Sequence, residues 1–427
     1  MSRGAAATRP EGLAAYSAVT AAYWAFMLTD GALRMLVLLH FHQLGFSPIE
    51  LAYLFLLYEV MGVVTNLSAG WLAVRFGLTR TLYAGLLLQI AALVALTQLD
   101  PSWGLTASVV FVMAVQGLSG VAKDLAKMSA KSAVKLLAPA EDGSALFRWV
   151  ALLTGSKNAV KGLGFLLGAV LLGLVGFTTA IVALAVGLAM IFAAVVLLMP
   201  AGLPGGRKGT AFRAVFSKDA AVNRLSAARL FLFGARDTWF VVGIPLYFYS
   251  VLSDGSPAGQ REAFFLIGSF MAVWIVGYGA VQALAPKLLR AREKSLREIL
   301  AAARFWVAVL TLIPATLAAA ALAAQGAADW LTAVLVAGLL LFGLVFALNS
   351  ALHSYLILAL TKAERVTLDV GFYYMANAAG RLLGTLLSGV SYQLGGLWAC
   401  LATAAVMALA SWLCARRLHD SRAVPVQ

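Results

Sequence analysis

YWAFMLTDGALRMLVLLHFHQLG, residues 23–45, decides the fold class, because this stretch is apolar and long enough to cross a bilayer. A membrane-spanning helix needs about 20 predominantly apolar residues. The stretch nevertheless carries Asp30 and Arg34 in its middle, and an ionised side chain near the bilayer centre costs about 2.5 kcal/mol or more. The two residues are four positions apart, hence on one helix face, where they can neutralise each other. We therefore expect this face to line a water-filled path through the protein.

The composition of the whole chain indicates an all-α polytopic membrane protein. Of its 427 residues, 62% are hydrophobic and 12% are charged, whereas about a quarter of the residues in a soluble protein are charged. The net charge of +14 is spread between the apolar runs, so it does not predict a nucleic-acid partner. Cys400 and Cys414 have no neighbouring histidine or cysteine and are interpreted as packing residues, not as metal ligands or a disulfide.

Hydropathy predicts roughly twelve membrane spans in windows of about 19 residues. Their centres lie near Phe26, Met61, Ile90, Phe111, Phe165, Leu188, Phe240, Val273, Val309, Leu341, Leu386 and Val406. Lysines and arginines gather in alternate gaps between these spans, with Arg261 as the exception. The positive-inside rule therefore predicts cytoplasmic termini and a multi-pass protein of the inner (plasma) membrane. The N-terminus is interpreted as a short cytoplasmic tail, not as a removed signal peptide.

A polar interruption divides the chain into two sets of spans. We expect an N-terminal six-helix bundle over residues 1–199, a cytoplasmic linker over 200–225 and a C-terminal six-helix bundle over 226–427. Asn158–Phe177 aligns without gaps over Asn377–Gly396, which is a weak sign of an internal repeat. Transporters built from two such halves bind their substrates near the midplane, between the halves.

The sequence GWLAVRFGLTR, residues 70–80, lies between the second and third predicted spans. It resembles the loop signature of the major facilitator superfamily, glycine-x-leucine-alanine-aspartate-arginine-x-glycine followed by basic residues. Its glycines permit a tight turn, and its arginines anchor at cytoplasmic headgroups. Val74 stands where the family has its acidic residue, which puts the charge relay of that loop in doubt. The residues that match the signature as a gating loop are Gly70, Arg75, Gly77 and Arg80.

Charged residues inside the predicted spans point to an anionic substrate. Besides Asp30 and Arg34, they are Glu59, Lys157, Lys161, Arg236, Asp237 and Arg381. Cations outnumber carboxylates in this set, and guanidinium groups bind oxyanions in a bidentate way. The resemblance to the facilitators places the first, fifth, seventh and eleventh spans around the central path, so these cations would surround it.

Several of these charges also have a purely structural interpretation, in which each cation pairs with a carboxylate and joins helices. Arg236 can pair with Asp237, as Arg34 can with Asp30. Glu59 could couple transport to protons, or it could be the counter-ion of Arg34. The histidines His40, His42 and His353 are interpreted as interfacial or packing residues. Lys123, Lys127, Lys131 and Lys135 recur every four residues, which is typical of a solvated or headgroup-facing helix surface.

The amino-acid sequences of several stretches are similar to those of one family. LTDGALRMLVLLHFHQLGFSP, FLLYEVMGVVTNL, GLSGVAKDLAKMSAKSAVKLL, FRWVALLTGSKNAVKG and LSAARLFLFGARDTWF together resemble the ArsJ organoarsenical efflux permeases, a branch of the major facilitator superfamily. The resemblance implies export of 1-arseno-3-phosphoglycerate, which forms when glyceraldehyde-3-phosphate dehydrogenase uses arsenate in place of phosphate. It therefore implies a functional link to that dehydrogenase, and arsenate resistance as the outcome.

The resulting hypothesis is an alternating-access exporter of a small anion, without a cofactor. The expected substrate-binding residues are Arg34, Lys157, Asn158, Lys161, Arg236, Asn377 and Arg381, and those for coupling or charge balance are Asp30, Glu59 and Asp237. An exchanger of phosphorylated or carboxylate metabolites is the alternative within transport. A membrane-embedded enzyme or sensor would need a nucleophile, a metal cluster or a soluble domain, and the sequence offers no motif for these.

Overall fold

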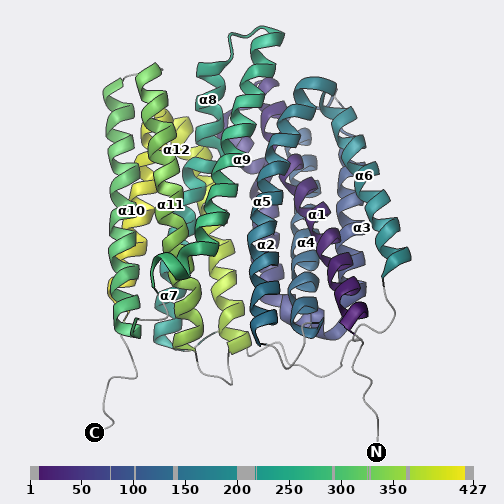
Figure 1. Ribbon diagram of the computed structural model, residues 1–427. Coiled ribbons are helices and arrows are strands. Elements are labelled where there is room, and N and C mark those ends of the chain that lie inside the picture. The colour runs from purple at the N-terminus through teal and green to yellow at the C-terminus, as the bar shows by residue number, and fades with distance from the viewer. Residues whose placement is uncertain are drawn as a thin grey trace, which may run out of the picture.

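The computed structural model describes residues 9–76, 78–100, 102–137, 143–199, 217, 219–290, 294–324, 326, 328–361 and 366–418. Within these ranges the regular elements are helices, which run side by side as a bundle (Figure 1). The first half of the chain contributes α1 (Arg9–Gln43), α2 (Pro48–Phe76), α3 (Leu78–Leu96), α4 (Leu105–Leu137), α5 (Gly143–Val175) and α6 (Phe177–Leu198). The second half contributes α7 (Ala220–Thr238), η2 (Trp239–Gly243), α8 (Ile244–Leu252), α9 (Pro257–Leu288), α10 (Leu296–Ala324), α11 (Asp329–Leu360) and α12 (Val366–Arg416).

In the described part of the chain, ten helices are long and apolar enough to cross a membrane. All predicted span centres fall within helices, but two regions differ from the prediction. The seventh span is shared by α7, the π-helical turn η2 and α8, and the polar side chains of α7 lower its hydropathy. The last two spans fall within α12, which leaves helical geometry at Gly396 (φ 67°, ψ −153°). Glycine adopts such a positive φ without steric cost, so the chain bends there.

Side chains at several helix starts satisfy free backbone N–H groups. Asp219 accepts from the backbone nitrogens of Ala221 and Val222 at the start of α7. Glu50 accepts from both the backbone N–H and the hydroxyl of Ser47 at the start of α2. Such caps stabilise a helix by about 1 kcal/mol. The cap at Asp219 also explains why α7 begins inside the stretch that was predicted to be linker.

Close helix approaches organise each half of the chain around a pair of crossing helices. In the first half α1 packs against α5, and in the second half α7 packs against α12. A Cβ atom added to Gly31 would lie 2.5 Å from the carbonyl oxygen of Lys161, and one added to Gly380 would collide with the carbonyl of Leu230. Only glycine fits at these crossings, which resemble the small-residue contacts of other membrane helices.

The two halves meet along α2 with α12 and along α5 with α9. In Figure 1 the helices α1–α6 lie on the right and α7, α10, α11 and α12 on the left. We call the end of the bundle that holds the start of α1 and the end of α12 the termini end, and the opposite end the far end. Contacts between the halves at the far end include Gln43 to Gln260 (2.9 Å), Ile49 to Gln393 (3.4 Å) and the His42 and Tyr249 rings.

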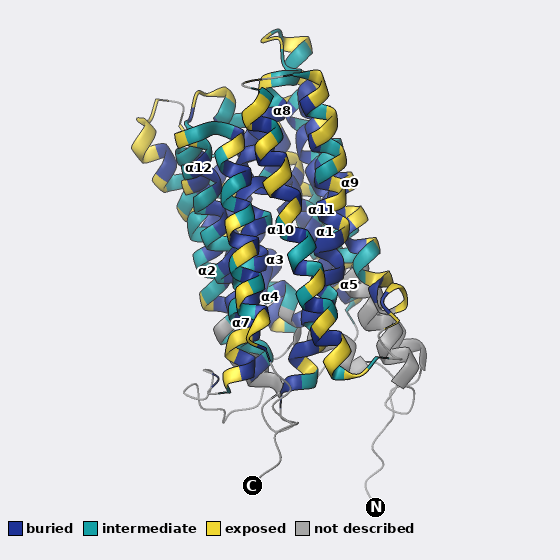
Figure 2. Ribbon diagram, turned by 90° about the vertical axis from the view of Figure 1, so that its left-hand side faces the viewer, coloured by how far each residue is buried: buried dark blue, intermediate teal, exposed yellow. Residues whose placement is uncertain are grey.

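The outside of the bundle exposes large apolar side chains, while the interior is buried (Figure 2). Leu197 and Leu394 are each 82% exposed, and Leu174 is 72% exposed. A continuous apolar surface of this kind is unfavourable in water. It suits a bilayer, where helices satisfy their backbone hydrogen bonds internally and present apolar side chains to lipid.

Candidate functional site

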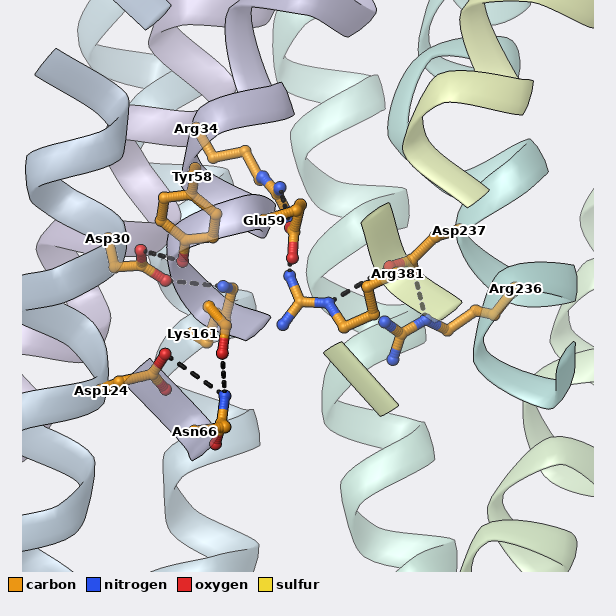
Figure 3. A network of polar contacts seen from close by, with 11 residues as sticks. Asp30, Arg34, Tyr58, Glu59, Asn66, Asp124, Lys161, Arg236, Asp237 and Arg381 are labelled. Carbon is orange, nitrogen blue, oxygen red and sulfur yellow. Dashed lines mark hydrogen bonds and ion pairs between the residues drawn. The ribbon is translucent and has the colours of Figure 1, made fainter. Parts of the chain in front are cut away.

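A chain of ion pairs joins the two halves in the middle of the bundle (Figure 3). Glu59 of α2 lies at its centre, and its Oε1 accepts a hydrogen bond from Nη2 of Arg34 at 2.6 Å. The same oxygen accepts from Nη2 of Arg381, on α12, at 2.6 Å. The other carboxylate oxygen, Oε2, is buried and has no hydrogen-bond partner in the described part of the chain. One carboxylate oxygen therefore holds an arginine from each half.

Asp237 of α7 continues this chain of ion pairs into the second half. It accepts from Nε of Arg236 at 2.5 Å and from Nε of Arg381 at 3.3 Å. Within the described residues, Arg34, Arg236 and Arg381 thus share two carboxylates, those of Glu59 and Asp237. These five connected side chains, which we call the arginine network, carry one surplus positive charge.

Asp30 of α1 belongs to a separate ion pair in the first half. Its carboxylate accepts from Nζ of Lys161 at 2.6 Å and from the hydroxyl of Tyr58 at 2.5 Å. The expectation that Asp30 and Arg34 neutralise each other is therefore wrong. Facing helices offer closer partners than the next turn of the same helix does: Lys161 comes from α5, and Glu59, the partner of Arg34, from α2. The alternatives that paired Glu59 with Arg34, and Arg236 with Asp237, are confirmed.

Solvent reaches the cations of these ion pairs more than it reaches the carboxylates. The side chains of Asp30, Glu59 and Asp237 are 1–2% exposed, whereas those of Arg34, Lys161, Arg236 and Arg381 are 12–17% exposed. In the described structure Arg34 uses only Nη2 for hydrogen bonds, and Arg236 uses only Nε. Arg381 uses Nε and Nη2. Each of the three arginines therefore keeps at least one donor nitrogen available for another acceptor.

A second polar cluster lies between α2 and α4. Asp124 accepts from Lys127 and from Thr65, both at 2.6 Å, and Nζ of Lys127 also donates to Asn66. Lys123 lies with its Nζ 4.1 Å from the centre of the Tyr58 ring. Lys123 and Asp124, the two residues of this helix that the sequence left as candidates for the cytoplasmic mouth of the path, therefore lie inside the bundle. The side chains of Lys131 and Lys135 lie outside the described residues.

A third polar cluster surrounds Arg229 of α7, which the sequence analysis did not single out. Its Nε donates to Oδ1 of Asn377 at 2.9 Å, and its Nη1 donates to the carbonyl and hydroxyl oxygens of Ser350 at 3.1 and 3.0 Å. The guanidinium also lies over the ring of Phe233, at 4.1 Å. The sequence could have indicated Arg229, because it lies next to the apolar run of the seventh predicted span.

Some of the other predicted site residues lie one helical turn from the ion-paired residues described above. Lys157 and Asn158 lie on α5, one turn before Lys161, and Asn377 lies on α12, one turn before Arg381. Of the gating loop, Arg80 is exposed at the start of α3. Gly77 and the side chain of Arg75 lie outside the described residues, as do the surroundings of Gly70 and, in the predicted linker, residues 200–216 and 218.

Other polar residues of the described chain offer no metal site. No group of three or more histidine, cysteine, aspartate or glutamate side chains within it is arranged to hold a metal ion. His40 stacks on Phe177, and His42 packs against Tyr249. Cys400 is buried, and Cys414 is partly buried.

Solved structures share this fold at low sequence identity. One comes from work on substrate recognition in proton-dependent oligopeptide transporters, with a TM-score of 0.69, 14% identity, and coverage of 95% of this chain and 98% of that one. Another is a POT family transporter in complex with 5-aminolevulinic acid, with a TM-score of 0.71, 15% identity, and coverage of 93% and 94%. A third is a POT family transporter in complex with a thioalcohol-conjugated peptide, with a TM-score of 0.69 and 15% identity, covering the same shares.

Family assignment rests on the sequence itself. No curated relative matches the chain. The family model of the Major Facilitator Superfamily, however, matches residues 19–357, which is most of the sequence. This match agrees with the helical bundle and with the transporters that share its fold, and the chain belongs to the Major Facilitator Superfamily.

Proposed function

We propose that this protein exports a small anion with two anionic groups by alternating access, and that 1-arseno-3-phosphoglycerate is that anion. The arginine network is the observation that carries the proposal. Three guanidinium groups share two carboxylates, and each keeps at least one unused donor nitrogen. Guanidinium groups bind phosphate-like oxyanions through charge-assisted hydrogen bonds, which are about twice as strong as neutral ones. A bound substrate anion would therefore neutralise the surplus positive charge of the network.

The two anionic ends of the substrate would bind to different halves of the chain. Arg34 and Lys161 extend from α1 and α5, and Arg236 and Arg381 extend from α7 and α12. Lys157 lies one turn from Lys161 and would add a further charge. Asn158 and Asn377 would supply neutral donors beside the charged groups. A substrate that engages both halves at once stabilises the closed state from which alternating access proceeds.

The choice of an arsenic ester rests on the resemblance to the ArsJ permeases. The stretches that carry the resemblance hold four of the five network residues: LTDGALRMLV contains Arg34, FLLYEVMG contains Glu59, and LFGARDTWF contains Arg236 and Asp237. Arg381 lies outside these stretches. The chemistry agrees with a pentavalent ester, because an oxyanion needs hydrogen-bond donors and positive charge, not thiols.

For the transport cycle we propose twelve crossings with both termini in the cytoplasm, so that the far end faces outwards. Residues 1–199 and 226–427 would move as two bundles joined by the linker 200–225. The contact of Gln43 with Gln260 closes the far end and would separate in the outward-facing state. The protein would work in the inner membrane, beside a cytoplasmic glyceraldehyde-3-phosphate dehydrogenase that forms its substrate.

The carboxylates would balance charge when the site is empty. Asp30, Glu59 and Asp237 neutralise most of the cationic charge in the absence of substrate. Glu59 holds Arg34 and Arg381 with one oxygen, so an incoming oxyanion could replace it on either arginine. The displaced carboxylate would then be free to take up a proton, which would couple export to proton movement.

An exchanger of ordinary phosphorylated or carboxylate metabolites is the second candidate, because the same free guanidinium nitrogens would bind those anions. Uptake into proteoliposomes of 3-phosphoglycerate, glycerol phosphate and succinate separates the two candidates. 5-Aminolevulinic acid, the ligand of one similar structure, serves as a zwitterionic control. Rapid exchange of the metabolites would favour the second candidate.

Arsenate resistance tests the first candidate in cells. An arsenate-sensitive host expresses the chain with or without additional glyceraldehyde-3-phosphate dehydrogenase, and cellular arsenic is measured. We expect resistance and lower cellular arsenic only when both proteins are present. Unchanged sensitivity, with the protein in the membrane, would contradict the proposed substrate.

A further inference from the structure

Arg229 differs from the arginines of the network in how its charge is compensated. It is 4% exposed, and its hydrogen bonds go to neutral oxygens of Asn377 and Ser350. In the part of the chain that the structure describes, no carboxylate pairs with it, and its Nη2 makes no hydrogen bond. A buried charge without a counter-ion is costly, and proteins usually pair it. Arg229 therefore lacks an anionic partner within the described residues.

Two residues near Ser350 on α11 also lack hydrogen-bond partners within the described residues. Asn349 and His353 lie one turn apart on α11 and are fully buried. The side-chain nitrogen and oxygen atoms of Asn349, and both ring nitrogens of His353, have no hydrogen-bond partner within the described residues. Ser350 lies on the same helix and accepts from Gln282 as well as from Arg229. Buried polar groups in proteins are almost always hydrogen-bonded, so Asn349 and His353 leave unused donors and acceptors on the helix that carries Ser350.

Arg229 lies on the way from the termini end to the network. It precedes Arg236 by seven residues on α7, which is about 10 Å along the helix axis. On α12 the order is the same, because Asn377 precedes Arg381 by one turn. Arg229 with Asn377, and Arg236 with Arg381, thus form two successive levels along the helices of the second half.

We propose that Arg229, with Asn377 and Ser350, forms a second subsite that holds one oxyanion group (carboxylate, phosphate or arsenate) before it reaches the arginine network. Nη2 of Arg229 and the amide nitrogen of Asn377 are the donors to that oxyanion, since Nε and Nη1 of Arg229 are already engaged. The subsite rests on the proposed anion transport and extends it with a binding step on the termini side. A purely structural Arg229 would instead only join α7 to α11 and α12.

The number of bound phosphate ions tests the subsite. The full chain in lipid nanodiscs is dialysed against radiolabelled inorganic phosphate, and binding is measured for wild type, Arg229→Gln and Arg381→Gln. We expect Arg229→Gln and Arg381→Gln each to bind one phosphate ion fewer per chain than the wild type. Loss of a charge-assisted hydrogen bond should weaken the affected subsite about 10- to 100-fold. Arg229→Lys keeps the charge and should retain the phosphate of the Arg229 subsite with reduced affinity.

Arg304→Gln is the matched control, because Arg304 is a partly buried arginine that bonds to the carbonyls of Ala415 and Leu418, away from the network. It should bind as many phosphate ions as the wild type. If Arg229→Gln stays folded and still binds the wild-type number, the subsite is refuted while the proposed function stands. If wild type binds none, the proposed anion site itself fails. If Arg229→Gln does not fold, Arg229→Lys decides: an unchanged affinity for every bound phosphate ion overturns the subsite.

Discussion

Arg381 and Glu59 lie 322 positions apart in the sequence, yet Nη2 of Arg381 donates to Oε1 of Glu59 at 2.6 Å. This ion pair crosses between the two halves of the chain, and Arg34 donates to the same oxygen from the first half. Relative movement of the halves must therefore change the partners of Glu59. In the proposed transport cycle, the ion pairs of the network would therefore change as the halves move, in addition to binding the substrate.

Replacing Glu59 with Gln should abolish export and destabilise the protein. The change leaves Arg34 and Arg381 without their shared counter-ion, and removing one partner of a buried ion pair costs about 3–5 kcal/mol. Arsenic export and thermal denaturation in detergent measure the two effects. Glu50→Gln is the control, since Glu50 only caps α2. It should cost about 1 kcal/mol and leave export intact.

Alanine at Lys161 or Arg381 should lower arsenate resistance at normal expression. Each change removes a cation from the proposed site, so that Asp30 keeps only the Tyr58 hydroxyl, or Glu59 only Arg34, among the partners described above. We expect at least a tenfold loss of transport rate, because each charge-assisted hydrogen bond contributes about 1.5–3 kcal/mol. Lys157→Ala should act in the same direction. Intact resistance in all three variants would refute the site.

Gly380→Ala should destabilise the crossing of α7 and α12. The added methyl group would collide with the carbonyl of Leu230, and overpacking of this kind typically costs about 1–3 kcal/mol. Gly371→Ala, on the same helix, meets no atom within 4 Å and should be neutral or slightly stabilising. Thermal denaturation of both variants provides the comparison, and equal stability would contradict the close helix contact.

A cross-link at the far end should stop transport. The side-chain amides of Gln43 and Gln260 are 2.9 Å apart, so cysteines at both positions should react with a short bifunctional thiol reagent. The background variant replaces Cys414 with Ala. We expect transport to stop after cross-linking and to return when a cleavable linker is reduced. Either single cysteine should have no such effect, and continued transport by the cross-linked protein would contradict closure at this end.

The sequence predicted the helices better than the contacts between them. Every predicted span centre falls within a helix, and ten helices of the described chain are long and apolar enough to cross a membrane. Apolar runs could predict this because length and hydropathy determine whether a segment suits a bilayer. Hydropathy could not reveal that α7 is followed by the π-helical turn η2. The hydroxyl of Ser388, on α12, accepts hydrogen bonds from the backbone nitrogens of Val242 and Gly243 in this turn. That contact depends on a helix that lies far away in the sequence.

Pairing of the charges shows the same limit. The spacing of Asp30 and Arg34 suggested a pair within one helix, but their partners, Lys161 and Glu59, come from other helices. Tyr58 was missed because a tyrosine in an apolar run has no distinctive pattern. The sequence identified the cations inside the spans as candidates, because a charged side chain in the bilayer carries a large free-energy cost. Which carboxylate each cation pairs with could be seen only in the three-dimensional structure.

The most direct test of the central claim is arsenic uptake into everted membrane vesicles that contain this protein. The vesicles receive glyceraldehyde 3-phosphate, NAD⁺, arsenate and glyceraldehyde-3-phosphate dehydrogenase. The account predicts that arsenic accumulates only when all four are present, and that accumulation is lost in Arg381→Ala vesicles. Accumulation from arsenate alone, or none with the complete mixture, would contradict export of an arsenylated triose acid through the arginine network.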